Sequence, residues 1–258
     1  MTTPAETAYA ADRSIFGKVR RRLSRIMHRR RARRGPDRPL LSITFDDAPL
    51  SATGLGAEIL ERHGVRGTFY AAAGLCGQIA PMGVCAGPED YLDLARRGHE
   101  VGCHTNSHLD CGQASGSEIR EDVDLNAAAF KAWGLPAPEN FAYPYGDVSA
   151  AAKSTLTSRF NSLRALHPGI VSTGTDLNQA PAVGIEGPEG EATARHWLRR
   201  AKAEKGWLIL YTHDVAPSPS AWGCTPEALE RLVQEAKNEG FDIVTVKAGI
   251  EAITYATS

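Results

Sequence analysis

Short apolar runs alternate with segments of helical periodicity along most of this chain. Seven runs have the length and apolar content of buried strands. They are Leu40–Phe45, Arg66–Ala72, His99–His104, Asn140–Tyr143, Ser162–Leu166, Trp207–His213 and Phe241–Val246. Between them, the spacing of apolar residues predicts helices at Leu55–His63, Pro88–Arg97, Ser117–Trp133, Ala150–Ser158, Ala192–Lys205 and Pro226–Asn238. This alternation favours an α/β fold, a distorted (β/α) barrel of about seven parallel strands.

The segment that precedes the first strand has a different pattern. From Ser14 to Arg34, apolar residues recur at helical spacing and arginines fill most other positions, until Gly35 and Pro36 end the pattern. We predict a basic amphipathic helix here, after a disordered polar start at residues 1–12. The chain is therefore expected to divide into residues 1–38 and one globular domain at residues 39–258.

Charge separates these two parts of the chain. Residues 13–38 hold 12 of the 29 lysines and arginines, whereas residues 1–38 hold only three of the 30 acidic residues. The basic helix, residues 14–34, could bind an anionic membrane surface, where each basic residue contributes about 1 kcal/mol. The alternative is a solvated helix or a tail that folds onto the acidic domain. A nucleic-acid partner is not expected.

The remaining composition bears on where the protein works. A 42% apolar share is typical of a globular protein with a sizeable core. No stretch approaches the eighteen or so apolar residues that span a bilayer, and an apolar secretory signal is not recognisable. The five cysteines are expected to be reduced thiols. We therefore expect a cytoplasmic protein, peripheral on the inner face of the inner membrane.

Residues with catalytic chemistry follow the ends of four predicted strands. Asp46 and Asp47 follow the first strand, His104 ends the third and His108 follows it, Tyr145 follows the fourth, and His213 closes the sixth. In a (β/α) barrel, the carboxyl ends of the strands meet on one face, which carries the active site. One carboxylate and two imidazoles suit a divalent metal with an open position, and a second carboxylate remains to move protons.

Each of these motifs has a structural interpretation as well. Asp46 and Asp47 could form a turn before Pro49, and the two histidines could be one buried and one surface residue. Cys103 and Cys111 flank the histidines and are alternative ligands, although strand alternation points Cys103 away from His104 and favours a core residue. Trp222 could stack on a sugar or anchor a loop.

Four motifs together resemble the NodB-homology polysaccharide deacetylases, carbohydrate esterase family four. They are TFDDAP at 44–49, HTNSH at 104–108, FAYPYG at 141–146 and LILYTHD at 208–214. The resemblance spans about residues 40–247. It implies a divalent metal, most often zinc, with Asp47, His104 and His108 as ligands. It also implies Asp46 as general base, the backbone N–H of Tyr145 as an oxyanion donor, and His213 as general acid.

The chain departs from the family pattern at two places. Many members carry an arginine at the position of Ala142, where it orients the catalytic aspartate. Arg164, at the end of another predicted strand, could reach the same place, which makes it a candidate catalytic residue. An acidic residue that tunes the acid histidine is not evident, and Asp176 is the nearest candidate.

The sequence therefore predicts a metal-dependent enzyme that removes N-acetyl groups from N-acetylhexosamine units such as N-acetylglucosamine. The expected substrate is a polysaccharide or a lipid-linked oligosaccharide, in exopolysaccharide biosynthesis or modification. Two alternatives remain: another amide or ester hydrolase on the same scaffold, such as an O-deacetylase or a cyclic-amide hydrolase, and a weakly active glycan-binding protein.

Overall fold

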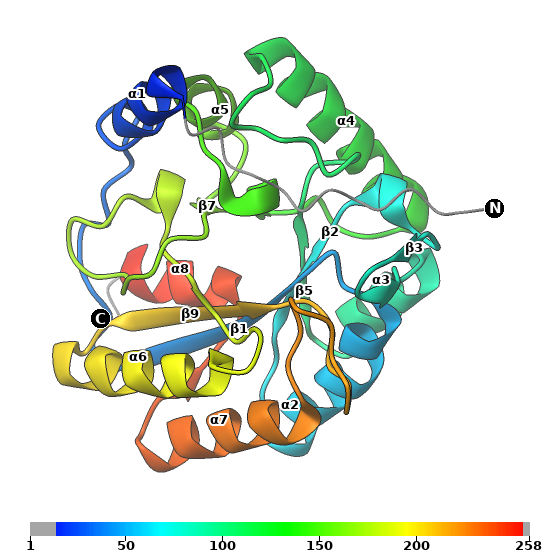
Figure 1. Ribbon diagram of the computed structural model, residues 1–258, viewed down its shortest axis with the longest axis vertical. Helices are drawn as coiled ribbons and strands as arrows, with labels where there is room; N and C mark the ends of the chain where they lie inside the picture. Colours follow the sequence, from blue (N-terminus) through cyan, green and yellow to red (C-terminus); the bar gives the residue numbers. More distant parts are fainter. Residues whose placement is uncertain (1–13, 255–258) are drawn as a thin grey trace.

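A curled parallel sheet forms the centre of the structure, a computed structural model that describes residues 14–254 (Figure 1). Seven strands follow the order β7-β6-β5-β2-β1-β9-β8, β10 also pairs with β1, and all these pairs are parallel. The strands are β1 (Leu40–Asp46), β2 (Thr68–Ala71), β5 (Glu100–Cys103), β6 (Asn140–Ala142), β7 (Ser162–Arg164), β8 (Val183–Gly184), β9 (Trp207–Thr212) and β10 (Asp242–Ile243). The distorted barrel predicted from the sequence is confirmed.

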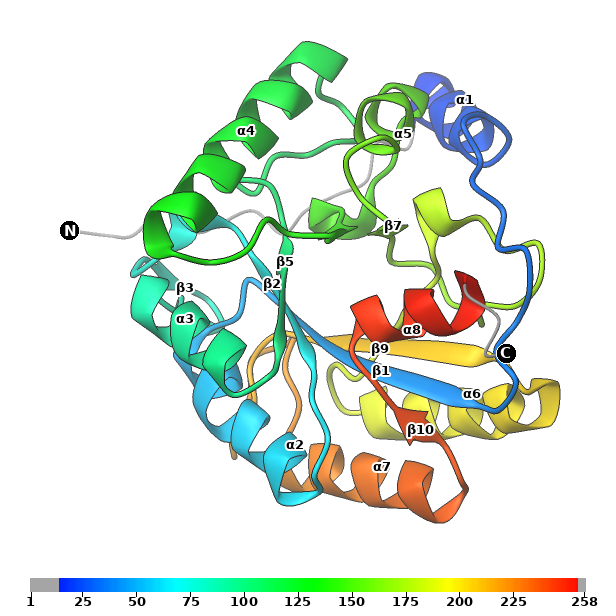
Figure 2. The same ribbon diagram turned by 180° about the vertical axis from the view of Figure 1, so that it is seen from behind.

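Helices surround this sheet. They are α1 (Ile15–Ser24), α2 (Ala57–Arg62), α3 (Pro88–Arg96), α4 (Gly116–Trp133), α5 (Ala150–Leu156), α6 (Gly190–Glu204), α7 (Pro226–Asn238) and α8 (Val246–Thr254). Helices α6 and α7 lie on one side of β1 and β9, and α8 lies on the other (Figures 1 and 2). A small antiparallel pair, β3 (Ile79–Ala80) and β4 (Gly83–Val84), stands apart from the sheet. Among the described helices, none has the length and apolar character needed to cross a bilayer.

The alternation of side chains along β1 separates a packing face from a chemical face. All seven residues of β1 are buried. Leu41, Ile43 and Phe45 point to the outer side, whereas the hydroxyl of Thr44 and the carboxylate of Asp46 belong to the inner side, because successive strand residues face opposite ways. One face of this strand thus packs into the apolar core, and the other face carries polar groups that can take part in catalysis.

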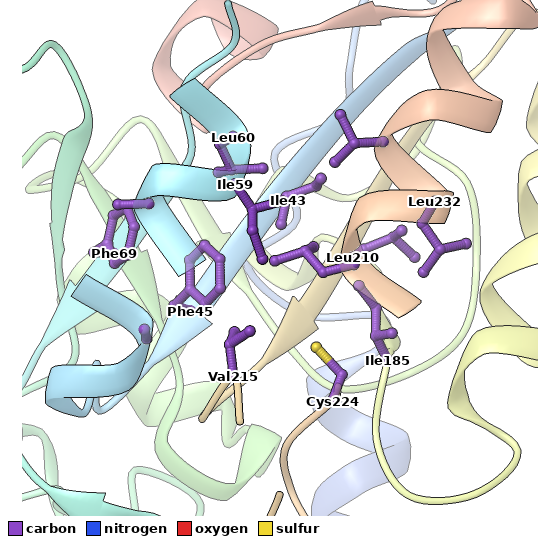
Figure 3. Close-up of a cluster of buried hydrophobic side chains, with 14 of the residues drawn as sticks. Ile43, Phe45, Ile59, Leu60, Phe69, Ile185, Leu210, Val215, Cys224 and Leu232 are labelled. Atoms are coloured by element: carbon purple, nitrogen blue, oxygen red, sulfur yellow. The ribbon is translucent and has the colours of Figure 1, made fainter. Parts of the chain in front are cut away.

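The outer face of the sheet is sealed by apolar packing. Phe45 stacks on Phe69 from β2 with ring centroids 4.6 Å apart. Leu60 from α2, Leu210 from β9 and Leu232 from α7 belong to the same buried cluster (Figure 3). A second cluster joins β5, β6 and β7 to α4 and α5. These clusters fix the strands, and therefore the positions at which their polar ends emerge.

One segment connects the two edges of the sheet. Ala180 exchanges backbone hydrogen bonds with β7, donating to Leu163 O at 2.8 Å and accepting from Ala165 N at 2.9 Å. Three residues later the chain pairs with β9 as β8. The sequence analysis missed β8 because this strand has only two residues. It also missed α8, since the predicted strand Phe241–Val246 stops at Ile243 and a helix starts at Val246.

The basic N-terminal helix is shorter than predicted. Its prediction to Arg34 is wrong, because α1 ends at Ser24 and His28 adopts a positive φ of 47°. The chain then runs extended against residues 174–177: Leu177 N donates to Arg30 O at 2.7 Å and Ala32 N to Thr175 O at 2.8 Å. Backbone pairing with a distant segment thus replaces the last helical turns. The predicted disorder of residues 1–12 lies outside the described residues.

The outer cluster gives the first testable prediction. Leu232 is fully buried, so Leu232→Ala is expected to lower the free energy of unfolding by about 2–5 kcal/mol, from lost apolar transfer and the cavity left behind. Leu125 on α4 is 54% exposed, and Leu125→Ala should change stability by no more than about 0.5 kcal/mol. Urea unfolding of both variants checks this, and equal losses would contradict the assigned packing.

Candidate active site

A buried ion pair lies at the centre of the site. Nη2 of Arg164 lies 2.5 and 2.6 Å from the two carboxylate oxygens of Asp46, and the arginine side chain is fully buried. The guanidinium also lies over the rings of Tyr70 and Tyr211, 5.1 and 5.4 Å from their centroids. The structure therefore brings Arg164 to the carboxylate that the sequence analysis expected it to reach.

The sheet register explains how Arg164 can stand in for an arginine at position 142. Ala142 on β6 and Arg164 on β7 are directly paired across neighbouring parallel strands. Residues paired in this way project to the same face of a sheet. An arginine on β7 in place of one at the paired position on β6 therefore keeps its charge on the inner face of the sheet.

Burial and neighbouring charges shift the pKa of Asp46 in opposite directions. Burial by itself raises the pKa of this carboxyl, but Arg164, and next to it His104 and His213, hold the pKa below its usual value. The carboxylate is therefore ionised at neutral pH. An ionised, oriented carboxylate that is not committed to a metal can accept a proton.

Asp47, His104 and His108 come together as the sequence predicted. One ligand atom from each lies within 4.8 Å of the others. The Nε2 atom of His104 is 3.8 Å from Asp47 Oδ1, and that of His108 is 3.5 Å from Asp47 Oδ2. Two ligands of a tetrahedral zinc ion, at about 2.0–2.1 Å from the metal, lie roughly 3.3 Å apart. The spacing therefore suits a divalent ion of this kind.

The surroundings of these side chains fit a metal as well. Asp47 Oδ1 is buried and has no hydrogen-bond partner among the residues that the structure describes, which is costly unless a cation binds it. His104 Nδ1 is 2.8 Å from Ala142 O, so this nitrogen donates its proton and Nε2 keeps a lone pair for a metal. Burial also lowers the pKa of His104 to about 4, which keeps the imidazole neutral. Donor type, spacing and protonation all agree with a zinc-like ion.

Backbone strain is concentrated at this site. Of the seven non-glycine residues with positive φ in the described part of the chain, five belong to the site motifs. They are Asp47, Ala48, Thr105, His108 and Tyr145. Such conformations cost free energy and persist where the surroundings enforce them. For the histidine loop, Asp122 from α4 does this by accepting bonds from the backbone N–H groups of Asn106 and Ser107 at 2.5 and 3.1 Å.

Tyr145 lies beside the metal ligands. Its φ of 58° and ψ of 0° turn the backbone sharply between Pro144 and Gly146. Its ring meets His108 edge-on, with centroids 4.4 Å apart. The structure thus places this loop next to the proposed reaction centre, whereas the role of its N–H group as an oxyanion donor stays a prediction.

His213 has an acidic partner that the sequence analysis did not find. Its Nδ1 lies 3.1 Å from Glu186 Oε1, just beyond β8. Burial alone lowers the pKa of His213, but the bond to Glu186 and the charges of Asp46 and Asp47 raise it to about 9. The imidazole is therefore protonated at neutral pH. The signal for Glu186 was weak because β8, which positions it, is so short.

Asp176, the candidate for that acidic partner, is elsewhere. It accepts from Lys153 Nζ at 2.5 Å and from Arg30 N at 3.0 Å, so it binds the N-terminal segment to the domain. The expectation for Asp176 is therefore wrong, because its carboxylate binds Lys153 of α5 and the backbone of Arg30, and Glu186 is the acid that lies beside His213.

The two cysteines that were alternative metal ligands are buried in the core. Cys103 and Cys111 are both fully buried in the cluster against α4 and α5, as expected for core residues, and all five cysteines are free thiols. The backbone carbonyl of Trp222 accepts the backbone N–H of His213 at 3.0 Å, and the ring is 39% exposed, so both interpretations of this side chain stay predictions.

Comparison with known proteins agrees with this geometry. Residues 33–159 match the family described as polysaccharide deacetylase. Over this range the chain is similar to that family. Its curated relatives include a peptidoglycan-N-acetylglucosamine deacetylase of Bacillus cereus, 26% identical over 208 residues that cover 80% of this chain and 86% of the relative.

Two further relatives extend the comparison. A bifunctional xylanase/deacetylase of Pseudobutyrivibrio xylanivorans is 24% identical over 207 residues, 80% of this chain, and the chain spans only 30% of that protein. Among solved structures, a family 4 acetyl xylan esterase from Clostridium thermocellum in complex with a cobalt ion aligns with a TM-score of 0.57 and 21% identity, covering 82% of this chain and 90% of that one. This similarity concerns the fold.

The pair of His213 and Glu186 gives a prediction for titration. Glu186→Gln is expected to lower the pKa of His213, because the variant loses the acidic partner of Nδ1. The raised pKa stabilises the fold below the ordinary histidine pKa, and this stabilisation is lost as pH rises through about 9, so the variant should lose it too. NMR titration of the imidazole measures the shift, with Glu189→Gln as a surface control. An unchanged pKa in Glu186→Gln would contradict the assignment.

Proposed function

We propose that this protein is a divalent-metal-dependent deacetylase that removes N-acetyl groups from N-acetylhexosamine units of a glycan. One observation carries the proposal. An ionised Asp46 held by Arg164, three side chains spaced to bind one metal ion, and a protonated His213 share one end of the barrel. The names of the relatives, which include a peptidoglycan and several chitin deacetylases, support a polysaccharide substrate. A role in exopolysaccharide biosynthesis and zinc as the metal are parts of the same proposal.

Asp47, His104 and His108 would hold the ion. When bound, a zinc-type ion polarises an acetyl carbonyl and brings the pKa of water toward neutrality. The chain's own residues have the remaining tasks. Asp46 takes a proton from the water that attacks the carbonyl carbon, and Arg164 keeps this base ionised and aimed. The N–H of Tyr145 donates to the oxyanion that forms, a contribution of about 3–4 kcal/mol in comparable sites.

The leaving group decides between the candidate reactions. When the carbon–nitrogen bond breaks, the amine must receive a proton, because an amine anion is a very poor leaving group. His213, with a pKa of about 9, carries that proton at neutral pH, and Glu186 keeps it there. An ester needs this proton less, since an alkoxide leaves more readily. The protonated histidine therefore favours N-deacetylation over O-deacetylation, which stays the second candidate because of the acetyl xylan esterase relative.

The proposed metal site is tested by acetate release from N-acetylglucosamine oligomers. We expect activity that a chelator abolishes and a divalent metal restores. Asp47→Ala should lose both bound metal, measured by elemental analysis, and activity, because it removes one of three ligands. Asp124→Ala, a change of an exposed aspartate, should keep both. Full activity of the chelated enzyme would refute the proposal, and faster release from acetylated xylan would favour the esterase.

The role of Arg164 is tested by moving its charge. Arg164→Ala should keep the metal but lower kcat about 10²-fold or more, because the base loses its orienting partner and its pKa rises. Adding Ala142→Arg to this variant returns a guanidinium from the paired position on β6 and should recover part of kcat. The pH–rate profile is the informative measurement: the acidic limb should move to higher pH in the single variant and back in the double variant. An unmoved limb would rule out this role.

A further inference from the structure

Helix α1 is docked with its polar side inward. Arg20 Nη2 lies 2.9 Å from Asp147 Oδ2, and the fully buried Lys153 donates from Nζ to the carbonyl of Ser24 at 2.6 Å. Gly17 and Ser24 are buried on the same side. Figures 1 and 2 both show α1 beside α5, at the periphery of the molecule. An amphipathic helix of a globular protein normally buries its apolar stripe, so this orientation is inverted.

Four apolar residues of this helix and of the turn after it face outward. Val19, Leu23, Ile26 and Met27 are 51%, 42%, 67% and 41% exposed. They follow one another at helical spacing, on α1 and in the turn after it, so they form one continuous stripe. Exposed apolar groups that gather in a single stripe indicate an interaction surface, whereas scattered ones do not.

Arginines border the stripe. Arg22 and Arg25 are exposed, and neither forms an ion pair with a residue in the described range 14–254. The globular domain has the opposite balance, with 17 basic and 27 acidic residues at positions 39–258. A partner that suits this surface must therefore offer apolar depth and negative charge together. An anionic lipid bilayer offers both, since acyl chains and headgroup phosphates lie within one interfacial layer.

We propose that the outward face of α1, formed by Val19, Leu23, Ile26 and Met27 with Arg22 and Arg25, docks this protein on an anionic lipid surface. The apolar stripe enters the headgroup region, and the arginines bind lipid phosphates. The inverted docking of the helix is what leaves the stripe available. This inference is independent of the deacetylase proposal, because it concerns no residue of the site.

The surface lies close to the catalytic loop. Asp147, which binds Arg20, is two residues beyond Tyr145, and Asp147 N donates to Pro144 O at 3.4 Å. Docking through α1 would therefore bring the site near the bilayer, within reach of a saccharide attached to a lipid. Such a substrate follows from combining both proposals.

Sedimentation with lipid vesicles tests the docking surface. The full chain is mixed with vesicles of phosphatidylcholine alone or with phosphatidylglycerol added, at low and at raised salt. Binding is expected only to the anionic vesicles and should weaken with salt, because exposed charges are screened. Arg22→Gln and Arg25→Gln should each weaken binding about fivefold, and Ile26→Asp should abolish it.

Matched changes on α4 serve as controls. Arg120→Gln and Leu125→Asp alter an exposed arginine and an exposed leucine of another helix, and they should leave vesicle binding unchanged. Thermal unfolding midpoints confirm that the variants fold. The proposal is overturned if the wild type ignores anionic vesicles, or if the α1 variants bind as the α4 controls do. It is also overturned if Ile26→Asp only dissociates a dimer in light scattering, which would make a second copy the occupant.

Discussion

The pair of Arg164 and Asp46 is the interaction on which the site depends. Both side chains are buried, and a buried carboxylate alone would take up a proton rather than stay charged. The guanidinium of Arg164 keeps the carboxylate charged. The rings of Tyr70 and Tyr211 in turn confine the guanidinium to one place. The ionised state of the base therefore follows from this pair. The pair joins β7 to β1, two strands that are not neighbours in the sheet order, on the inner face of the curled sheet.

Some residues of the site stand on rigid strands, and others stand on loops with strained backbone conformations. Asp46 and Arg164 stand on strands, where apolar packing on the outer face leaves them little freedom. Asp47, His108 and Tyr145 stand on loops with positive φ, which aim their groups at one point at a cost in backbone free energy. The packing of the outer clusters offsets this cost. A catalytic geometry that no regular strand could supply is thereby held in place.

The N-terminal segment shows that amphipathicity alone does not say which side of a helix is buried. The sequence left open whether this segment binds a membrane or folds onto the acidic domain. In the structure, α1 contacts the domain through Arg20 and Ser24, while Val19 and Leu23 are exposed. The contacts of Arg20 and Ser24 thus confirm that this segment folds onto the domain. Binding to lipid stays a proposal.

The sequence by itself determined the longer strands, the barrel and the residues of four motifs, because apolar periodicity and strand ends are local features. It therefore brought Asp47, His104 and His108 together before any coordinates, through the rule that parallel strands end on one face. Only the tertiary structure decided which acid serves His213, which side of α1 is buried, and that Arg164 reaches Asp46. These contacts join residues 27 to 129 positions apart through sheet register and loop path, and no local pattern encodes such distances.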